Sequence, residues 1–146
     1  MITIFTIGFT NKSAKVFFEL LEQSKVKTIV DTRINNVSQL AGYTKGTDLS
    51  FFARRVANIG YEHKIEFAPT KELLNRYRKK QMSWAEYEIE YLNLLDIRNI
   101  KNKVVVEQLN HSCLLCSEHL PDKCHRRLLA EYLQKTSSDI QIIHLK

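Results

Sequence analysis

The sequence predicts a single three-layer α/β domain over residues 1–146, with a mostly parallel sheet of about five strands and helices on both faces. Three observations lead to this prediction. The chain of 146 residues has the usual length of one domain. Apolar runs of strand length alternate with amphipathic runs of helix length, as in proteins built on a parallel sheet. Only two prolines and four glycines occur, and they mark no linker between domains.

Five segments are predicted to be strands, and four of them are rich in β-branched or other apolar residues. These segments are residues 2–7, 28–31, 61–67, 113–117 and 140–144. Strands separated by helices run parallel, and right-handed crossovers favour the Rossmann-like strand order 3-2-1-4-5. Residues 104–109 fit a helix or a strand, and the hydrophobic period does not decide between them.

Amphipathic helices are predicted between these strands. The apolar faces of the first, second and last helices consist of Val16, Phe17, Leu20 and Leu21; of Phe51, Phe52, Val56 and Ile59; and of Leu128, Leu129, Tyr132 and Leu133. The predicted N-caps are Asn11 or Ser13, Asp48, Thr70, Ser83 (in a capping box with Glu86) and Asp122. Gly60 is expected to end the second helix.

The net charge indicates the kind of partner, and the positions of the cysteines indicate the cellular compartment. A net charge of +6 favours an anionic partner, either a small phosphate-bearing molecule or a nucleic acid. No apolar run reaches the length of about 18 residues that a membrane span needs, so no membrane partner is expected. All three cysteines lie between residues 113 and 124, whereas a secreted fold spreads paired cysteines along its chain. We therefore expect a reducing, cytoplasmic location.

Polar residues follow three of the predicted strands, at residues 8–11, 31–33 and 116–118. The carboxyl ends of parallel strands lie at one edge of a sheet, where α/β proteins bind their ligands. We therefore expect one polar site at this edge. Its predicted members are Asp31, Arg33, Cys116, Glu118, Cys124, His125 and Arg126.

Cys116 and Cys124 are the strongest candidates for chemistry. If Asp122 caps the last long helix, Cys124 and His125 fall in its first turn, where the helix dipole and Arg126 stabilise a thiolate. Three roles remain open for Cys124: a nucleophile, a redox partner of Cys116, or a metal ligand. The alternative is that both cysteines are small buried apolar residues.

Zinc is the alternative cofactor, and no bound cofactor is predicted. Donor atoms are available on Cys113, Cys116, His119, Cys124 and His125. However, Cys113 and Cys116 lie three apart in a strand and so face opposite sides of the sheet. The segment is also unlike a cysteine phosphatase or rhodanese loop, because the distance to the arginine is too long and the loop contains no glycine.

Asp31 and Arg33 alternate along a strand end, so both face the same side of the sheet. Asp31 is a candidate base and Arg33 a candidate clamp for a phosphate or carboxylate. The alternative is a structural pair that ties down the following loop.

Basic residues also alternate with aromatic residues between positions 52 and 84, as in proteins that stack nucleic-acid bases. The spacing fits better an ordinary amphipathic helix with a buried apolar face and a solvated charged face. The residues of this region are Phe52, Arg54, Arg55, Lys71, Arg76, Tyr77, Arg78, Lys79, Lys80 and Trp84.

These motifs resemble those of the bacterial and archaeal family called domain of unknown function 488. The likeness covers nearly the whole chain and rests on Thr6-Ile7-Gly8 with Thr10, on Asp31-Thr32-Arg33 with Ser38, on residues 60–63, and most of all on Leu115-Cys116-Ser117-Glu118 followed by Cys124-His125-Arg126. Two positions differ from the family: Phe9 stands where a histidine is usual, and Phe67-Ala68-Pro69 stands where a leucine and two glycines are expected. The resemblance implies the α/β fold and the place of the site, and it adds Thr6, Gly8, Thr10 and Ser38 as candidate substrate-binding residues.

The leading hypothesis is an enzyme-like domain that binds a phosphate-bearing substrate, a nucleotide or a nucleic acid, at the carboxyl edge of its sheet. In this hypothesis the anion is held by Arg33, His125 and Arg126; the proton is carried by Glu118 or Asp31; and the thiolate is Cys116 or Cys124. One alternative is a non-enzymatic module that binds nucleic acid through its basic helices. The other is a thiol redox switch or a Cys/His metal site.

Overall fold

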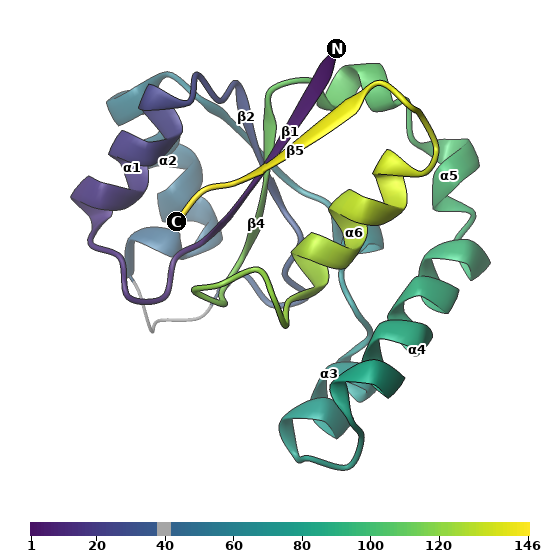
Figure 1. Ribbon diagram of the computed structural model, residues 1–146. Helices are drawn as coiled ribbons and strands as arrows, with labels where there is room; N and C mark the ends of the chain where they lie inside the picture. The colour runs from purple at the N-terminus through teal and green to yellow at the C-terminus, as the bar shows by residue number, and fades with distance from the viewer. Residues whose placement is uncertain (38–41) are drawn as a thin grey trace.

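A computed structural model describes residues 1–37 and 42–146, and a sheet of five parallel strands forms the centre of this part of the chain (Figure 1). The strands are β1 (Ile2–Gly8), β2 (Thr28–Asp31), β3 (Gly60–His63), β4 (Ser112–Cys116) and β5 (Ile140–His144). The predicted α/β class is confirmed. β3 is shorter than predicted, because the chain leaves the sheet after His63 and Ile65–Phe67 forms a 3₁₀ turn.

The strand order is β3-β2-β4-β1-β5, so the predicted order 3-2-1-4-5 is wrong in the positions of β1 and β4. The connection from β1 to β2, which contains helix α1 (Ala14–Gln23), therefore passes over β4. β1 and β4 are both apolar and largely buried, so their composition does not distinguish between the two central positions. The observed order places Gly8, at the end of β1, directly beside Cys116, at the end of β4.

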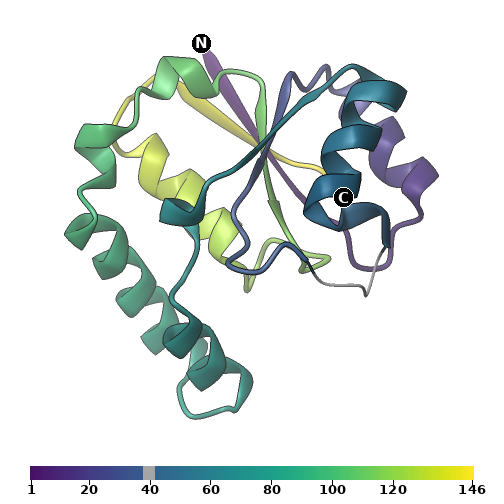
Figure 2. The ribbon, with the colours of Figure 1, turned by 180° about the vertical axis from the view of Figure 1, so that it is seen from behind.

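Helices cover both faces of the sheet (Figures 1 and 2). On one face lie α1 and α2 (Gly46–Ala57), and on the other lie α3 (Lys71–Arg78), α4 (Trp84–Ile97), α5 (Ile100–Lys103) and α6 (His125–Gln134). Phe5 and Ile7 pack against the first group and Ile4 against the second, as the alternation of side chains along a strand requires. Within the described residues, no helix combines the length and the apolar character that crossing a bilayer demands.

Local signals placed most helix starts correctly. Ser13, Thr70 and Ser83 are N-caps whose side chains accept a hydrogen bond from a backbone N–H three residues ahead, and Glu86 completes the capping box. Residues 104–109, which fitted either a helix or a strand, contain a 3₁₀ helix over Val106–Leu109.

Three predicted helix ends are wrong. Asp48 lies inside the first turn of α2 and does not cap it. α2 ends at Asn58, which adopts the left-handed conformation (φ 52°) that asparagine tolerates, and Gly60 is left to start β3. Cys124, and not Asp122, is the N-cap of α6. The last difference bears on the site, because it puts a thiol at the positive end of a helix.

α3 and the first turns of α4 extend past the carboxyl edge of the sheet, on the side of α6 (Figure 1). Their buried side chains belong to the same core as the sheet, where Leu73, Tyr87 and Tyr91 cluster with Val30 and Leu128. This helical hairpin therefore forms a wall beside the ends of the strands.

Candidate functional site

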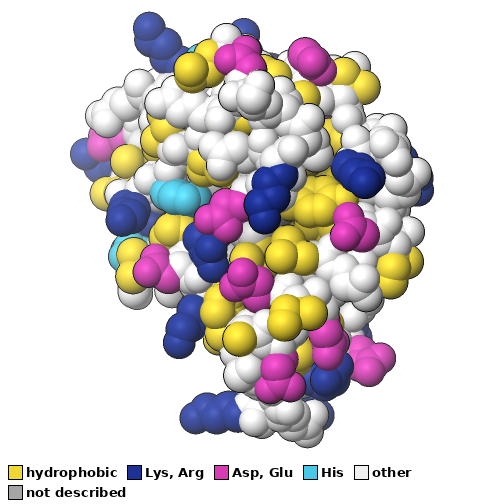
Figure 3. Space-filling model, turned by 45° about the vertical axis from the view of Figure 1, so that its right-hand side comes forward, with side chains coloured by type: hydrophobic (Ala, Val, Ile, Leu, Met, Phe, Trp, Pro, Cys, Tyr) yellow, Lys and Arg dark blue, Asp and Glu magenta, His cyan; other side chains and the backbone are white. Residues whose placement is uncertain are grey.

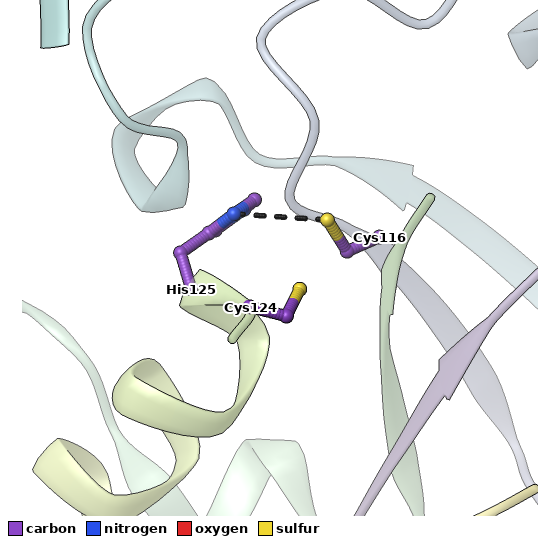
Figure 4. Close-up of side chains that lie close together, drawn as sticks. All are labelled: Cys116, Cys124 and His125. Carbon is purple, nitrogen blue, oxygen red and sulfur yellow. Dashed lines mark hydrogen bonds between the residues drawn. The ribbon is translucent and has the colours of Figure 1, made fainter. Parts of the chain in front are cut away.

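The end of β4 and the start of α6 bring two thiols and an imidazole together (Figure 4). Cys116 is the last residue of β4, Cys124 is the N-cap of α6, and His125 is the first residue of that helix. The Sγ atom of Cys116 lies 3.7 Å from Nδ1 of His125. The two sulfur atoms and a ring nitrogen of the histidine all lie within 4.8 Å of one another, and all three residues are buried.

Thr32, which directly follows β2, orients the imidazole of His125. The ring nitrogen Nε2 lies 2.9 Å from the carbonyl oxygen of Thr32 and 3.0 Å from its Oγ1. The Thr32 hydroxyl already donates to the carbonyl of Leu115 at 2.7 Å, so both Thr32 oxygens accept from the ring. Nε2 therefore carries a hydrogen, and Nδ1 is the nitrogen that faces Cys116.

The neighbours of Cys116 favour its thiolate. The neighbouring Cys124 thiol, together with His125 and the charge of Arg126, lowers the pKa of Cys116 well below its usual value although burial opposes this. Burial raises the pKa of Cys124, which stays a thiol and a donor. Burial alone would lower the pKa of His125, but the Cys116 thiolate and the Thr32 carbonyl outweigh it, and the pKa is raised. The favoured state is a Cys116 thiolate beside a His125 imidazolium.

The thiols and the imidazole line one side of a pocket of about 300 Å³. Tyr77 of α3 and Trp84 and Tyr87 of α4 line another side, and Phe9 and Arg33 also line it. The rings of Trp84 and Tyr87 are nearly parallel, with centroids 5.0 Å apart, and Tyr77 meets the Trp84 ring edge-on at 5.5 Å. The thiolate therefore faces a pocket with an aromatic wall.

Sequence reasoning missed this wall as part of the site. Tyr77 and Trp84 were expected only in a separate basic and aromatic region, and neither Tyr87 nor Thr32 was expected in the site. The capping box at Ser83 was a usable signal for the start of α4, but it carries no information on what that helix packs against. Thr32 stands between two candidate residues, and its hydroxyl was the signal that could have drawn attention to it.

Asp31 and Arg33 form a buried ion pair. The carboxylate of Asp31 accepts bonds from Nε and Nη2 of Arg33 at 2.9 and 2.8 Å and from the hydroxyl of Tyr61. Nη2 of Arg33 also donates to the carbonyl of Thr44, so the pair ties the loop after β2 to the chain beyond it. Asp31 is fully buried and does not line the pocket, which fits the structural alternative for this residue; Arg33 lines the pocket.

Arg126 holds the loop between β4 and α6 in place through hydrogen bonds to its backbone. Its guanidinium is fully buried and donates to the backbone carbonyls of Glu118, at 2.7 Å, and His119, at 3.3 Å. The same loop crosses Gly8 so closely that a Cβ atom there would collide with the Glu118 carbonyl oxygen. Neither Arg126 nor Gly8 lines the pocket, so both position the loop.

Thr6 and Thr10, two further substrate-binding candidates, do not line the pocket. Thr6 is fully buried, and its hydroxyl lies 2.6 Å from Nδ1 of His144 in β5. The carbonyl of Thr10 accepts a hydrogen bond from the ring of His119 at 3.1 Å. Ser38 lies outside the described residues.

Glu118 and Cys113, two further residues named from the sequence, differ from each other in solvent exposure. Glu118 lines the pocket with an exposed carboxylate. Cys113 is fully buried in the core under α1 and α2, on the opposite face of the sheet from Cys116, as the strand alternation predicted. Burial also raises the pKa of Cys113, which makes it an inert core residue.

The same cluster has the donor set of a metal site. Two sulfur atoms and one ring nitrogen can bind zinc, and the second nitrogen of His125 bonds a backbone carbonyl, as in many metal-binding histidines. Three protein donors are one fewer than a closed structural zinc site needs.

Fold and site together define a class of protein: a parallel α/β protein with a pair of thiols and an imidazole at the carboxyl edge of its sheet. The chain belongs to the family described as Domain of unknown function DUF488, whose family model matches residues 13–133. The matched part contains Thr32, both thiols of the cluster and His125, and it begins after β1. No curated protein and no solved structure matches the chain.

Proposed function

We propose that this protein is a thiol-dependent enzyme that acts on a phosphate-bearing substrate, a nucleotide or a nucleic acid, with Cys116 as the nucleophile. One observation carries the proposal: the Cys116 sulfur lies beside Nδ1 of His125, whose other nitrogen is held by Thr32, and both residues line a pocket. A thiol, a base and a group that orients the base are the three parts of an activated nucleophile.

The proposed reaction is a hydrolysis in two steps. The Cys116 thiolate attacks an electrophilic atom of the substrate and forms a bond to it. The bond to the leaving group breaks, its electron pair departs with the leaving group, and the Nδ1 proton of His125 neutralises that group. Water then attacks the covalent intermediate and returns a proton to His125. The hydroxylated product leaves, and Cys116 is again a thiolate.

Two neighbours have supporting roles in this reaction. The neighbouring Cys124 thiol lowers the pKa of Cys116 and so helps to keep it ionised. Glu118 lines the pocket and is exposed, so it can exchange a proton between the attacking water and the solvent.

The charges around the pocket favour an anionic substrate. Arg78 and Lys123 both line it, and no acidic side chain within the described residues forms an ion pair with either, whereas the charge of Arg33 is balanced by Asp31. These two positive charges stand against one carboxylate of the lining, that of Glu118. A thiolate nucleophile also requires reducing conditions, so the proposal includes a cytoplasmic location.

The proposal is tested by turnover of nucleoside phosphates and short oligonucleotides, with products separated by chromatography. We expect Cys116→Ser to lower the rate by about three orders of magnitude. Cys124→Ser and Glu118→Gln should lower it by about a hundredfold. The matched control is Cys113→Ala, which removes a thiol on the other face of the sheet and should keep the rate.

Two results would contradict the proposal. The first is an unchanged rate in all three pocket variants on every substrate that the wild type processes. The second is one equivalent of zinc retained on the freshly purified protein in native mass spectrometry, because Cys116 would then be a ligand and not a nucleophile.

A thiol switch is the second candidate, and the short distance between the sulfur atoms of Cys116 and Cys124 favours it. Both thiols are free in this structure. Mild oxidation followed by peptide mapping would show a bond between them if they form a redox pair. A map without that bond removes this candidate.

Fewer observations support the third candidate, a non-enzymatic module that binds nucleic acid. Arg76 is bonded to Glu90 at 2.8 Å, and Arg54 and Arg55 lie on α2, across the sheet from Tyr77. Basic and acidic side chains are interleaved on the face shown in Figure 3. A strand of nucleic acid binds best where basic groups gather on one surface.

A further inference from the structure

The α4 side of the pocket holds a polar group that the proposed mechanism does not use. Tyr87 is only 2% exposed and lines the pocket. Within the described residues its hydroxyl has no hydrogen-bond partner. Burial, and then the charge of Cys116, raise the pKa of this phenol, so it stays protonated and can donate. The ring is buried, but the hydroxyl oxygen is not fully enclosed, so it can donate a hydrogen bond to an acceptor on a ligand in the pocket.

Arg33 supplies a second donor of the same kind. Its side chain is 6% exposed and lines the pocket. Nε and Nη2 are bonded to Asp31 and Thr44, whereas Nη1 has no partner among the described residues. Because Asp31 balances the charge, Arg33 offers a directed N–H more than a free positive charge. Two unpaired donors beside one thiolate match the oxygens of an anionic group.

The aromatic wall accepts a different kind of group. Tyr77 and Trp84 are partly exposed, line the same pocket and meet edge-to-face. Partly exposed aromatic rings beside a positively charged site are a common surface for stacking a planar heterocycle. Arg78 and Lys123 add positive charge to the same pocket.

The size of the pocket limits the ligand. A volume of about 300 Å³ is at the small end for ligand pockets and is suited to one compact molecule. A single nucleotide combines the planar ring and the anionic group in a molecule of this class, whereas a nucleic-acid strand needs an extended groove.

We infer that the pocket binds a single nucleoside monophosphate, with the base against Tyr77 and Trp84 and the phosphate accepting hydrogen bonds from Tyr87 and Arg33 beside Cys116. The α3–α4 hairpin is then the element that recognises the substrate. This inference rests on the proposed function and deepens it by naming the substrate class.

Trp84 is the only tryptophan of the chain, so its fluorescence reports binding at the wall directly. The probes are AMP, GMP, CMP and UMP, with adenosine, ribose 5-phosphate and inorganic phosphate as partial ligands. We expect saturable quenching by at least one monophosphate. Its affinity should exceed that of each partial ligand by about tenfold or more, because only the whole nucleotide uses both parts of the pocket.

Three variants locate the binding. Tyr87→Phe removes only the hydroxyl and should weaken binding about tenfold. The matched control is Tyr132→Phe, whose hydroxyl bonds Asp96 outside the pocket and should leave binding unchanged. Cys116→Ser should bind the monophosphate at least as tightly as the wild type, because it removes the thiolate charge beside the phosphate while it abolishes turnover.

The outcomes separate this inference from the proposed function. Absence of quenching by all four monophosphates, or equal affinity of Tyr87→Phe and the wild type, would overturn the inference even if Cys116-dependent turnover of other substrates persists. Nucleotide binding that depends on Tyr87, without any turnover that depends on Cys116, would support the inference and remove the proposed function.

Discussion

At the scale of single residues, each group in the site determines the protonation of the next. Thr32 accepts the hydrogen of Nε2 and so turns Nδ1 of His125 toward Cys116. The sulfur of Cys124 lies within 4.8 Å of the same sulfur, and the Cys124 thiol helps to lower the pKa of Cys116. The low pKa of Cys116 therefore comes from partners at the start of α6, with His125 oriented by Thr32, and not from its own strand.

This arrangement predicts the pH dependence of Cys116 alkylation. A thiol whose pKa is lowered from 9.0 keeps its thiolate as the pH falls, until the pH passes below the lowered value. We expect iodoacetamide to label Cys116 at pH values where Cys113 and Cys124 do not react. Cys124→Ala removes the main cause of the shift and should move the labelling profile to higher pH.

The measurement is the labelling rate against pH, with the modified cysteine identified by mass spectrometry. A wild-type profile centred near the ordinary value of 9.0 would refute the assignment of Cys116 as a thiolate at neutral pH. Labelling at Cys113 serves as an internal control for unfolding, because that thiol is fully buried in the core.

At the scale of elements, the loop between β4 and α6 decides where Cys124 and His125 lie. Arg126 bonds two of its carbonyls, and the amide of Thr10 donates to the carbonyl of Ser117 at 3.1 Å. The loop can approach β1 this closely because Gly8 has no side chain.

Gly8→Ala is therefore expected to destabilise the protein by about 1–3 kcal/mol, because the new methyl group displaces the backbone at Glu118. The free energy of unfolding in urea measures this effect. The matched control is Gly42→Ala, where no described atom lies within 4 Å of the added Cβ, and its free energy of unfolding should stay within about 0.5 kcal/mol of the wild type. Equal stability of the two variants would show that the loop is not held against β1.

At the scale of the whole molecule, one sheet separates two apolar cores. α1 and α2 close one core, and α3 to α6 close the other, with strand residues contributing to both. The hairpin that carries Trp84 shares its core with β1, β2 and β4. Neither core can be exposed without exposing a face of the shared sheet.

This shared sheet predicts one cooperative unfolding transition for residues 1–146. The fluorescence of Trp84 reports the hairpin, and far-UV circular dichroism reports all helices. We expect the two signals to give the same urea midpoint, as in a single domain. An earlier fluorescence transition would instead make the α3–α4 hairpin an independent unit.

Much of the fold follows from residues that are close together in the sequence. Most strands are recognisable as apolar runs. Ser13, Thr70 and Ser83 cap helices by accepting a hydrogen bond from the backbone N–H three residues ahead. The order of the strands could not be predicted in the same way. β1 and β4 are similar in composition, so the sequence does not show which of them lies beside β2. Cys124 replaced Asp122 as a cap because the loop before α6 is held by contacts with distant residues.

The sequence by itself determined the class of fold and the chemical groups at the carboxyl edge of the sheet, because both depend on local pattern and on the direction of parallel strands. Only the tertiary structure decided which groups meet. Thr32 and His125 bond across 93 positions of the chain, Asp31 is enclosed by Arg33 and Tyr61, and α4 folds its aromatic residues over the thiols. Contacts at such separations are selected by the packing of the whole core, which no short segment of the chain specifies.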